Sequence, residues 1–258
     1  MDRGYSSPNF VCRRLPVIAD HPLKNDDLET YQLVNALSSA LTGGETIVTD
    51  AGSLYYIVGQ AFKTKVNQRI IVSGALGAMG YALPASLGIS VEDKEGTTIC
   101  VTGYGSMQVN VQELATVARY APNLKIIVIN NNGYASIRNT QAAFCNANYA
   151  GIDPQTGVGL PNWDGLCSAY ALRYLKCDKH SALGHIFQQM IDIKGPVFVE
   201  CVMPESVEMV PAVTSTKLDD GTFVSCRLHE MSPLLRSEEL SELGIDSELL
   251  SAMVGSVA

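Results

Sequence analysis

The sequence predicts an α/β protein with a six-stranded, mainly parallel sheet, helices on both faces of that sheet and an extended C-terminal tail. Two observations support this fold class. Apolar runs rich in β-forming residues alternate along the chain with segments of helical periodicity. These runs are also nearly continuous, which is typical of parallel strands buried on both faces. Since 47% of the 258 residues are hydrophobic and 17% are charged, the chain can form a sizeable core.

The expected elements follow one another in a regular alternation, and the crossovers between parallel strands should be right-handed. In chain order they are helix Asp27–Leu41, strand Thr46–Thr49, helix Leu54–Phe62, strand Ile70–Ser73, helix Ala78–Ile89, strand Thr97–Thr102, helix Gln108–Tyr120, strand Leu124–Asn130, helix Trp163–Ala171, strand Arg173–Lys176, helix Ser181–Ile193 and strand Val197–Val202.

One uncharged segment, Ile70–Val91, is long enough to cross a bilayer. It contains Gly74, Gly77, Gly80 and Pro84 and opens with the strand-like "IIVSG". We therefore interpret it as a strand, a glycine turn and a core helix.

The two ends of the chain lack this alternation. Residues 1–26 show little periodicity and are interpreted as a linker or as the tail of an upstream domain. Residues 27–203 form the predicted α/β domain. Residues 204–258 are rich in Pro, Asp and Thr at first, with a turn at Asp219–Gly221, and should form an extended tail that ends in a short helix at Ser237–Leu250.

Charge and cysteine content limit the classes of partner and the compartment. The net charge of −8 and the pI near 5.0 argue against nucleic acid or an anionic membrane as the main partner. The seven cysteines form no CxxC pair, which favours buried free thiols over a disulfide framework or a zinc site. The N-terminus shows no apolar signal segment, so we expect a cytoplasmic protein.

Four loops that follow expected strands combine glycine with small polar residues. They are "TDAGS" at 49–53, "SGALGAMG" at 73–80, "TGYGS" at 102–106 and "NNNGY" at 130–134. Ligands of open parallel sheets bind beyond the carboxyl ends of the strands. Glycine lets the backbone approach a ligand and present N–H groups to anionic oxygens. Each loop alone has an ordinary explanation as a tight turn, but four at one sheet edge predict an anion site.

The third and fourth loops have a suggestive spacing. Tyr104 lies 27 residues before Asn131, an interval of one helix plus one strand, so both positions follow neighbouring strands. A carboxylate at the first position and an amide oxygen at the second would suit Mg²⁺ that also binds a diphosphate.

These motifs resemble the diphosphate-binding, C-terminal domain of thiamine-diphosphate enzymes, in particular acetolactate synthase-like proteins. The family signature Gly-Asp-Gly-Ser, followed after about 25 residues by Asn-Asn, is similar to Gly103–Ser106 and Asn130–Asn131 here. "SGALGAMGYALPASLG" at 73–88, "TDAGS" and "PAVTSTKLDDGTFVS" at 211–225 add to the resemblance, which covers roughly residues 9–236.

The resemblance implies a set of site residues for thiamine diphosphate and Mg²⁺. The Asn131 side chain and the Gly133 carbonyl would bind the metal. Gly105 and Ser106 would bind the diphosphate, and Gly52 and Ser53 would lie near it or near the pyrimidine. The Gly77 carbonyl would accept a hydrogen bond from the aminopyrimidine, and Met79 would hold the cofactor bent.

Three departures from the family pattern affect the expected function. Tyr104 occupies the position of the metal-binding aspartate, and a phenol with a pKa of about 10 is a poor Mg²⁺ ligand. The glutamate that activates the cofactor belongs to a pyrimidine-binding domain, and the residues before 27 are too few to form one. The segment "NGYASIRNTQ" lacks the Gly-Met-Val and tryptophan of acetolactate synthases, so the 2-keto acid substrate stays open.

Two functions remain open from the sequence. The first is a diphosphate- and Mg²⁺-binding module of a 2-keto acid decarboxylase or carboligase, a lyase or transferase that works as a homo-oligomer or with a chain carrying the pyrimidine-binding domain. The second is a non-catalytic remnant that keeps the fold and an oligomer interface. An ordinary dinucleotide-binding dehydrogenase is disfavoured because no GxGxxG follows the first strand.

Overall fold

Six strands form one sheet that is parallel throughout, in the order β2-β1-β3-β4-β6-β5. The strands are β1 (Thr46–Val48), β2 (Arg69–Ile71), β3 (Thr98–Gly103), β4 (Leu124–Asn130), β5 (Arg173–Cys177) and β6 (Val197–Val202). This arrangement confirms the predicted fold class. Because all the strands run in the same direction, the loops that follow them lie at one edge of the sheet.

The structure is a computed structural model that describes residues 17–23, 25–120, 123–213, 215–217, 222–225 and 231–232. The chain divides into two compact units. One is His21–Val207, which contains the sheet, and the other is Met1–Asp20 together with Glu208–Ala258.

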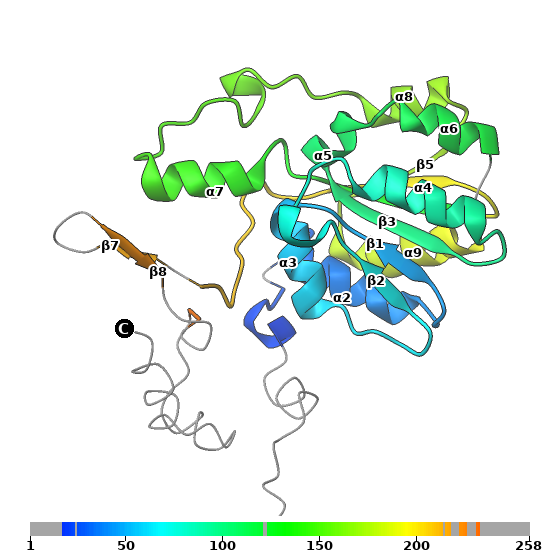
Figure 1. Ribbon diagram of the computed structural model, residues 1–258, viewed down its shortest axis with the longest axis horizontal. Coiled ribbons are helices and arrows are strands. Elements are labelled where there is room, and N and C mark those ends of the chain that lie inside the picture. The colour runs from blue at the N-terminus through cyan, green and yellow to red at the C-terminus, as the bar shows by residue number, and fades with distance from the viewer. Residues whose placement is uncertain are drawn as a thin grey trace, which may run out of the picture. The chain divides into compact units, whose positions relative to one another are not determined.

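Helices cover both faces of the sheet (Figure 1). One face carries α4 (Ala82–Glu92), α6 (Glu113–Tyr120) and α8 (Trp163–Ala169), and the other carries α2 (Thr30–Ala40), α3 (Gly52–Ala61) and α9 (Leu183–Asp192). Two further helices, α5 (Tyr104–Val109) and α7 (Ala135–Phe144), begin directly after β3 and just beyond β4. The 3-10 turns are η1 (Val17–Asp20), η2 (Gly74–Leu76), η3 (Pro154–Thr156) and η4 (His180–Ala182).

The core lies around the central strands. All residues of β1 and nearly all of β3, β4 and β6 are buried, as expected for continuous apolar strands between two helical layers. On the face of α4 and α8, Trp163 and Phe198 anchor a large apolar cluster. This rigid core fixes the carboxyl ends of β1, β3 and β4, where the predicted loops begin.

The helix expected at Gln108–Tyr120 is two helices, α5 and α6, separated by Asn110–Gln112. Asn110 causes the break, because its side-chain amide donates to the Gly80 carbonyl at 2.6 Å instead of lying on a helix surface. The helical periodicity of the sequence continues through this point, so the expectation of one helix was wrong.

The start of α4 and the presence of α7 are the larger of the remaining departures from the expected helices. α4 begins at Ala82 instead of Ala78, because Gly77 and Gly80 have positive φ values of 54° and 79° that end a helix rather than begin one. α7 was not predicted at all. Only Ala135 is buried in α7, so the helix shows little of the apolar periodicity by which helices are recognised.

The segment Ile70–Val91 contains β2, η2 and α4, as interpreted from the sequence. Within the described residues, no helix has the length and apolar character needed to cross a bilayer. Of the cysteines that are described, Cys100, Cys167, Cys177 and Cys201 are buried free thiols as expected, whereas Cys145 is a free thiol that is exposed.

The smaller unit contains a two-stranded antiparallel ribbon. Its strands are β7 (Ser215–Lys217) and β8 (Phe223–Ser225), and an isolated bridge pairs Ala212 with Ser232. The ribbon lies in the segment for which an extended tail is predicted. The predicted turn at Asp219–Gly221 and the predicted helix at Ser237–Leu250 lie outside the described residues.

Candidate functional site

A pocket of about 110 Å³ lies where β1, β3 and β4 end. It is lined by the first residues of α3, α5 and α7, and these helices follow the three strands directly. Seven of the eight predicted cofactor residues line this one pocket: Gly52, Ser53, Met79, Gly105, Ser106, Asn131 and Gly133. Gly77 does not line it, although it lies two residues before Met79 in the exposed turn that follows η2.

The starts of α3 and α7 present backbone donors to the pocket. Neither helix has a side-chain cap, so the N–H groups of its first turn precede the first helical hydrogen bond. For α3 these residues are Gly52, Ser53 and Leu54. For α7 they are Ala135, Ser136 and Ile137, and all six residues line the pocket. Two helix N-termini that meet in one cavity create a positive potential that suits an anion.

The two helix starts also contact each other. The Ser53 and Ser136 hydroxyl oxygens lie 3.2 Å apart across the pocket. A Cβ at residue 52 would lie 3.2 Å from the Ser136 hydroxyl, and Gly52 has a φ of +65°. Glycine therefore suits this position for both space and backbone conformation.

Gly105 lies beneath an aromatic ring. A Cβ at this position would lie 2.0 Å from Cε1 of Tyr134, so only glycine lets the ring pack on the loop. Ser106 is buried, and its hydroxyl lies close enough to the Asp50 carboxylate to favour the charged form of that group. The Ser106 hydroxyl, which the resemblance assigns to the diphosphate, therefore lies between the pocket and Asp50.

Asp50 joins the loops behind the pocket. Its carboxylate accepts hydrogen bonds from the N–H groups of Ala51 (2.8 Å) and Ala82 (3.2 Å) and from the Thr102 hydroxyl (3.2 Å). Burial raises the pKa of this carboxyl group above its usual value, although these hydrogen bonds oppose the shift. Asp50 stands inside the quoted "TDAGS" loop, but no sequence signal shows that its side chain points inward.

Tyr104, the residue at the family's aspartate position, belongs to the core through its side chain. It is only 2% exposed and packs edge-on against Trp163, with ring centroids 5.0 Å apart. Its hydroxyl donates to the Pro161 carbonyl. Burial and the nearby charge of Glu200 raise the pKa of this phenol, so it stays neutral. The phenol oxygen is thus hydrogen-bonded to Pro161 and does not replace a carboxylate ligand for a metal.

Asn131 and Gly133 line the pocket where β4 ends. Asn131 is 8% exposed, and its side chain forms no hydrogen bond with any residue that the structure describes. Gly133 has a φ of +142°, and a Cβ there would lie 1.9 Å from the Ile152 carbonyl oxygen. The neighbouring Tyr134 N–H donates to the same oxygen at 2.9 Å. Glycine is therefore required at position 133, because the backbone passes so close to the Ile152 carbonyl there (a backbone crossing). This requirement does not depend on what the Gly133 carbonyl binds.

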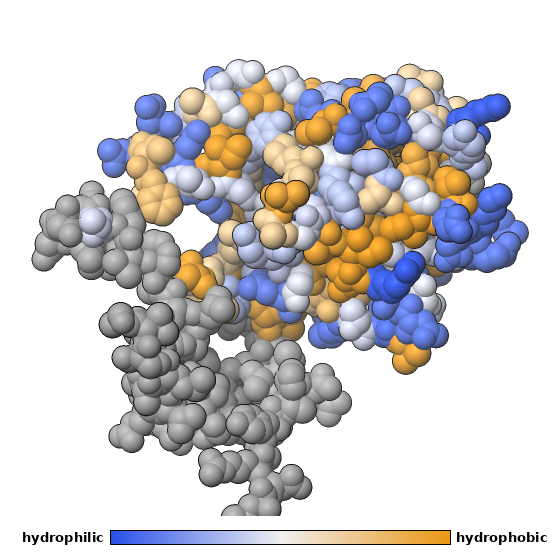
Figure 2. Space-filling model, in the orientation of Figure 1, coloured by the Kyte–Doolittle hydropathy of each residue, from blue (hydrophilic) through white to orange (hydrophobic). Residues whose placement is uncertain are grey.

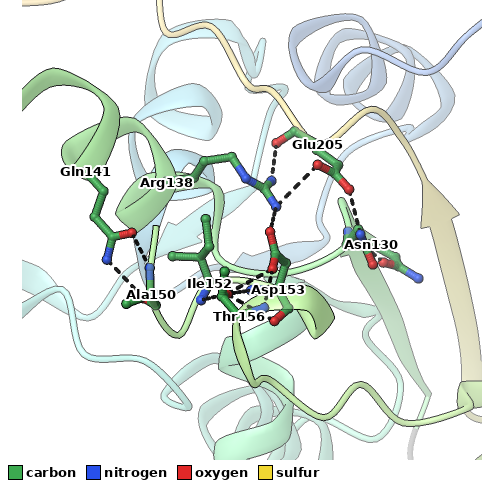
Figure 3. A network of polar contacts seen from close by, with 9 residues as sticks. Asn130, Arg138, Gln141, Ala150, Ile152, Asp153, Thr156 and Glu205 are labelled. Carbon is green, nitrogen blue, oxygen red and sulfur yellow. Dashed lines mark hydrogen bonds and ion pairs between the residues drawn. The ribbon is translucent and has the colours of Figure 1, made fainter. Parts of the chain in front are cut away.

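A polar network holds the β4–α7 turn in place (Figure 3). Asn130 accepts a hydrogen bond from the Asn132 N–H at 3.1 Å. Its side-chain amide also donates to Glu200 on β6 at 2.6 Å. Arg138 of α7 lies between Asp153 (3.1 Å) and Glu205 (3.4 Å). The first asparagine of the Asn-Asn pair is thus structural, and the second is left for the pocket. The sequence did not reveal this network, because its members lie up to 75 residues apart.

The pocket suits an anion better than a metal ion. None of the described residues that line it carries a charge, and the neutral oxygens of Asn131 and the Gly133 carbonyl are the ligands predicted for Mg²⁺. Among the described residues, no group of three or more His, Cys, Asp or Glu side chains could hold a metal. The residues fit the diphosphate of thiamine diphosphate, but they lack the anionic ligand that a divalent cation prefers.

Comparison with known proteins gives the family. Residues 50–201, which include the glycine loops at 73–80, 102–106 and 130–134 and all but the first residue of the loop at 49–53, match the family described as thiamine pyrophosphate enzyme, C-terminal TPP binding domain. The chain belongs to this family. Thiamine pyrophosphate is thiamine diphosphate, so the resemblance identified from the sequence is confirmed, and the six-stranded parallel sheet agrees with it.

Similar proteins include the acetolactate synthase large subunit of Cyanidium caldarium, which is 31% identical over 190 residues, 74% of this chain and 32% of the relative. The acetolactate synthase isozyme 1 large subunit of Escherichia coli K12 is 26% identical over 192 residues, 74% of this chain and 34% of the relative. The chain therefore spans about a third of the length of these relatives.

The surface beside the pocket carries exposed apolar side chains. Leu76 is 88% exposed, and Met79 and Ile137 are 40% and 42% exposed. Met79 and Ile137 line the pocket themselves. Figure 2 shows hydrophobic residues gathered on the face that carries β2, the edge strand whose following loop contains Leu76.

Proposed function

We propose that this chain is the diphosphate-binding module of a thiamine-diphosphate-dependent 2-keto acid decarboxylase or carboligase similar to acetolactate synthase. The observation that carries the proposal is the single pocket that collects Asn131, Gly133 and the starts of α3 and α7 in a thiamine pyrophosphate enzyme domain. When bound, thiamine diphosphate supplies the carbon nucleophile and the electron sink for decarboxylation.

In this proposal the protein's own residues bind and orient the cofactor. The backbone N–H groups of α3 and α7 hold the diphosphate, and Met79 supports the rings from the exposed rim of the pocket. The Asn131 amide and the Gly133 carbonyl are the candidate ligands for Mg²⁺. Because the Tyr104 phenol is bonded to Pro161, Mg²⁺-dependent binding and catalysis are impaired in the chain as written.

The pyrimidine end of the cofactor requires a second domain. We propose that the module works in a homo-oligomer or with a subunit that carries the pyrimidine-binding domain. The exposed apolar residues Leu76, Met79 and Ile137 support this, since exposed apolar patches mark partner surfaces. The relatives' greater length is consistent with a further domain in those proteins.

The alternative function is a non-catalytic module that keeps the fold and an oligomer interface. The burial of Tyr104 favours it, because the side chain at the aspartate position now serves the core. This alternative differs from the main proposal in one measurable respect, since it requires no affinity for thiamine diphosphate.

A calorimetric titration with thiamine diphosphate, with and without Mg²⁺, tests the proposal. We expect weak but measurable binding by the chain, and tighter Mg²⁺-dependent binding by Tyr104→Asp. Restoring the carboxylate should raise the Mg²⁺-dependent affinity about a hundredfold, or about 2.8 kcal/mol.

Because Tyr104 is buried, the variant must first be shown to be folded by circular dichroism. If the unmodified chain already binds tightly with Mg²⁺ and the folded variant gains nothing, another group has replaced the carboxylate. If neither protein binds the cofactor, the non-catalytic alternative is supported.

A further inference from the structure

We propose that the pocket binds the diphosphate group as a metal-free anion, held by backbone N–H groups and the Asn131 amide, so that Mg²⁺ is not required for binding. The inference rests on the proposed function, because it concerns the diphosphate end of the same ligand. In a metal-bridged site, by contrast, affinity for the diphosphate disappears when the metal is removed.

The starts of α3 and α7 supply several backbone donors at the pocket. The six N–H groups at the starts of α3 and α7 have no acceptor among the residues that the structure describes, and both helices are 10 residues long. Their residues all line the same pocket. Such groups need an acceptor from water or from a ligand, and an anion satisfies several of them at once.

Asn131 adds a donor that belongs to neither helix. The residue is buried to more than nine-tenths, lines the pocket and has no hydrogen-bond partner in the described part of the chain. The amide is therefore free to hydrogen-bond with a ligand or with water in the pocket. Its NH₂ group can donate to a phosphoryl oxygen beside the backbone N–H groups.

The charge of the pocket lining also favours a metal-free anion. None of the described residues that line the pocket carries a carboxylate, so a divalent cation would meet only neutral oxygens among them. The Asp50 carboxylate does not line the pocket, and it already accepts hydrogen bonds from Ala51, Ala82 and Thr102. The Tyr104 phenol is likewise turned to Pro161. The chemistry of the lining therefore favours an anion that arrives without a metal.

The experiment is a calorimetric titration of the full chain with three probes: inorganic pyrophosphate, thiamine diphosphate and thiamine. Each titration is carried out in EDTA and in Mg²⁺. We expect both diphosphates to bind in EDTA with dissociation constants within about tenfold of those in Mg²⁺. Binding of thiamine diphosphate in Mg²⁺ but not in EDTA would overturn the inference.

Two substitutions at Asn131 sharpen the test. Asn131→Ala removes a donor and should weaken binding in EDTA by about tenfold. Asn131→Asp adds a negative charge, so it should weaken metal-free binding further and make Mg²⁺ strengthen binding. Asn148→Asp adds the same charge at an exposed position outside the pocket and should change nothing. Unchanged binding by both folded Asn131 variants would contradict the inference.

The probes also separate this inference from the proposed function. If pyrophosphate binds in EDTA as tightly as thiamine diphosphate does, the metal-free anion site stands but the thiamine cofactor role fails. If thiamine diphosphate binds only with Mg²⁺, the cofactor role stands and the metal-free site fails. Absence of binding by both diphosphates under either condition overturns both.

Discussion

Some motif residues of this protein face the ligand pocket, and others hold the structure together. The Asn131 amide lines the pocket and has no partner among the described residues, whereas the adjacent Asn130 bonds to Glu200 and to the turn. Tyr104 has two roles within one residue, since it lines the pocket and its ring packs on Trp163. The identity of a motif residue therefore does not show by itself which of these roles its side chain has.

The substitution Tyr104→Phe tests the core role of Tyr104. It removes the hydroxyl that bonds to the Pro161 carbonyl and should lower the free energy of unfolding by about 1–2 kcal/mol. Thiamine diphosphate affinity should not change, because the phenol oxygen is not offered to the pocket. Urea unfolding and calorimetry measure the two effects, with Tyr120→Phe at a 65% exposed site as the control. A large loss of affinity with full stability would contradict the core role.

At the scale of elements, the sequence predicted the parallel strands well and the pieces of the site less well. β4 and β6 match their expected bounds because a continuous apolar run has few alternative structures. α7 was missed because it is held by polar contacts such as Arg138 with Asp153, not by an apolar face. The pocket loops were predicted from glycine content, but the inward direction of Asp50 depends on contacts between distant elements that periodicity does not encode.

The backbone crossing at Gly133 gives a prediction for the β4–α7 connection. Gly133→Ala places a Cβ against the Ile152 carbonyl at a φ of +142°, so it should cost about 2–4 kcal/mol of unfolding free energy. Gly59→Ala is the matched control. Gly59 lies inside α3 with nothing within 4 Å of its Cβ position, and the change should add about 0.5–1 kcal/mol. Equal effects of the two changes in urea unfolding would show that the crossing imposes no strain.

For the whole molecule, the binding edge and the opposite edge of the sheet have different chemistry. The carboxyl edge collects glycine and small polar residues, while the amino end of β4 carries a buried lysine. Lys125 is 1% exposed, and its ammonium group donates to the carbonyls of Ile193 and Gly195 at 2.5 and 2.8 Å. These carbonyls lie between α9 and β6, so Lys125 links the sheet to its last crossover.

Lys125 should make the stability of the molecule depend on alkaline pH. Burial lowers the pKa of Lys125 from 10.5 to about 8. Between about pH 8 and pH 10.5 the unfolded chain binds more protons at Lys125 than the folded chain does. The contribution of Lys125 to the free energy of unfolding therefore rises with pH. At about 1.4 kcal/mol per pKa unit, the rise reaches roughly 3 kcal/mol.

The measurement is urea unfolding at about pH 7.5 and about pH 10.5, which span the titration of this lysine. Lys125→Met should be less stable than the unmodified chain, with a deficit that grows with pH, while Lys63→Met at an exposed site should follow the unmodified chain. A deficit that stays constant would mean that Lys125 keeps an ordinary pKa in the folded state.

The contact between Tyr104 and Trp163 also has an optical consequence. Trp163 is the only tryptophan among the 258 residues and is 1% exposed, so its indole emission comes from one dry environment. That ring lies edge-on to the residue with which α5 begins beside the pocket. Displacement of α5 by a bound ligand should therefore change the intensity or wavelength of the emission, and the unmodified chain provides its own fluorescent reporter for titrations of this site.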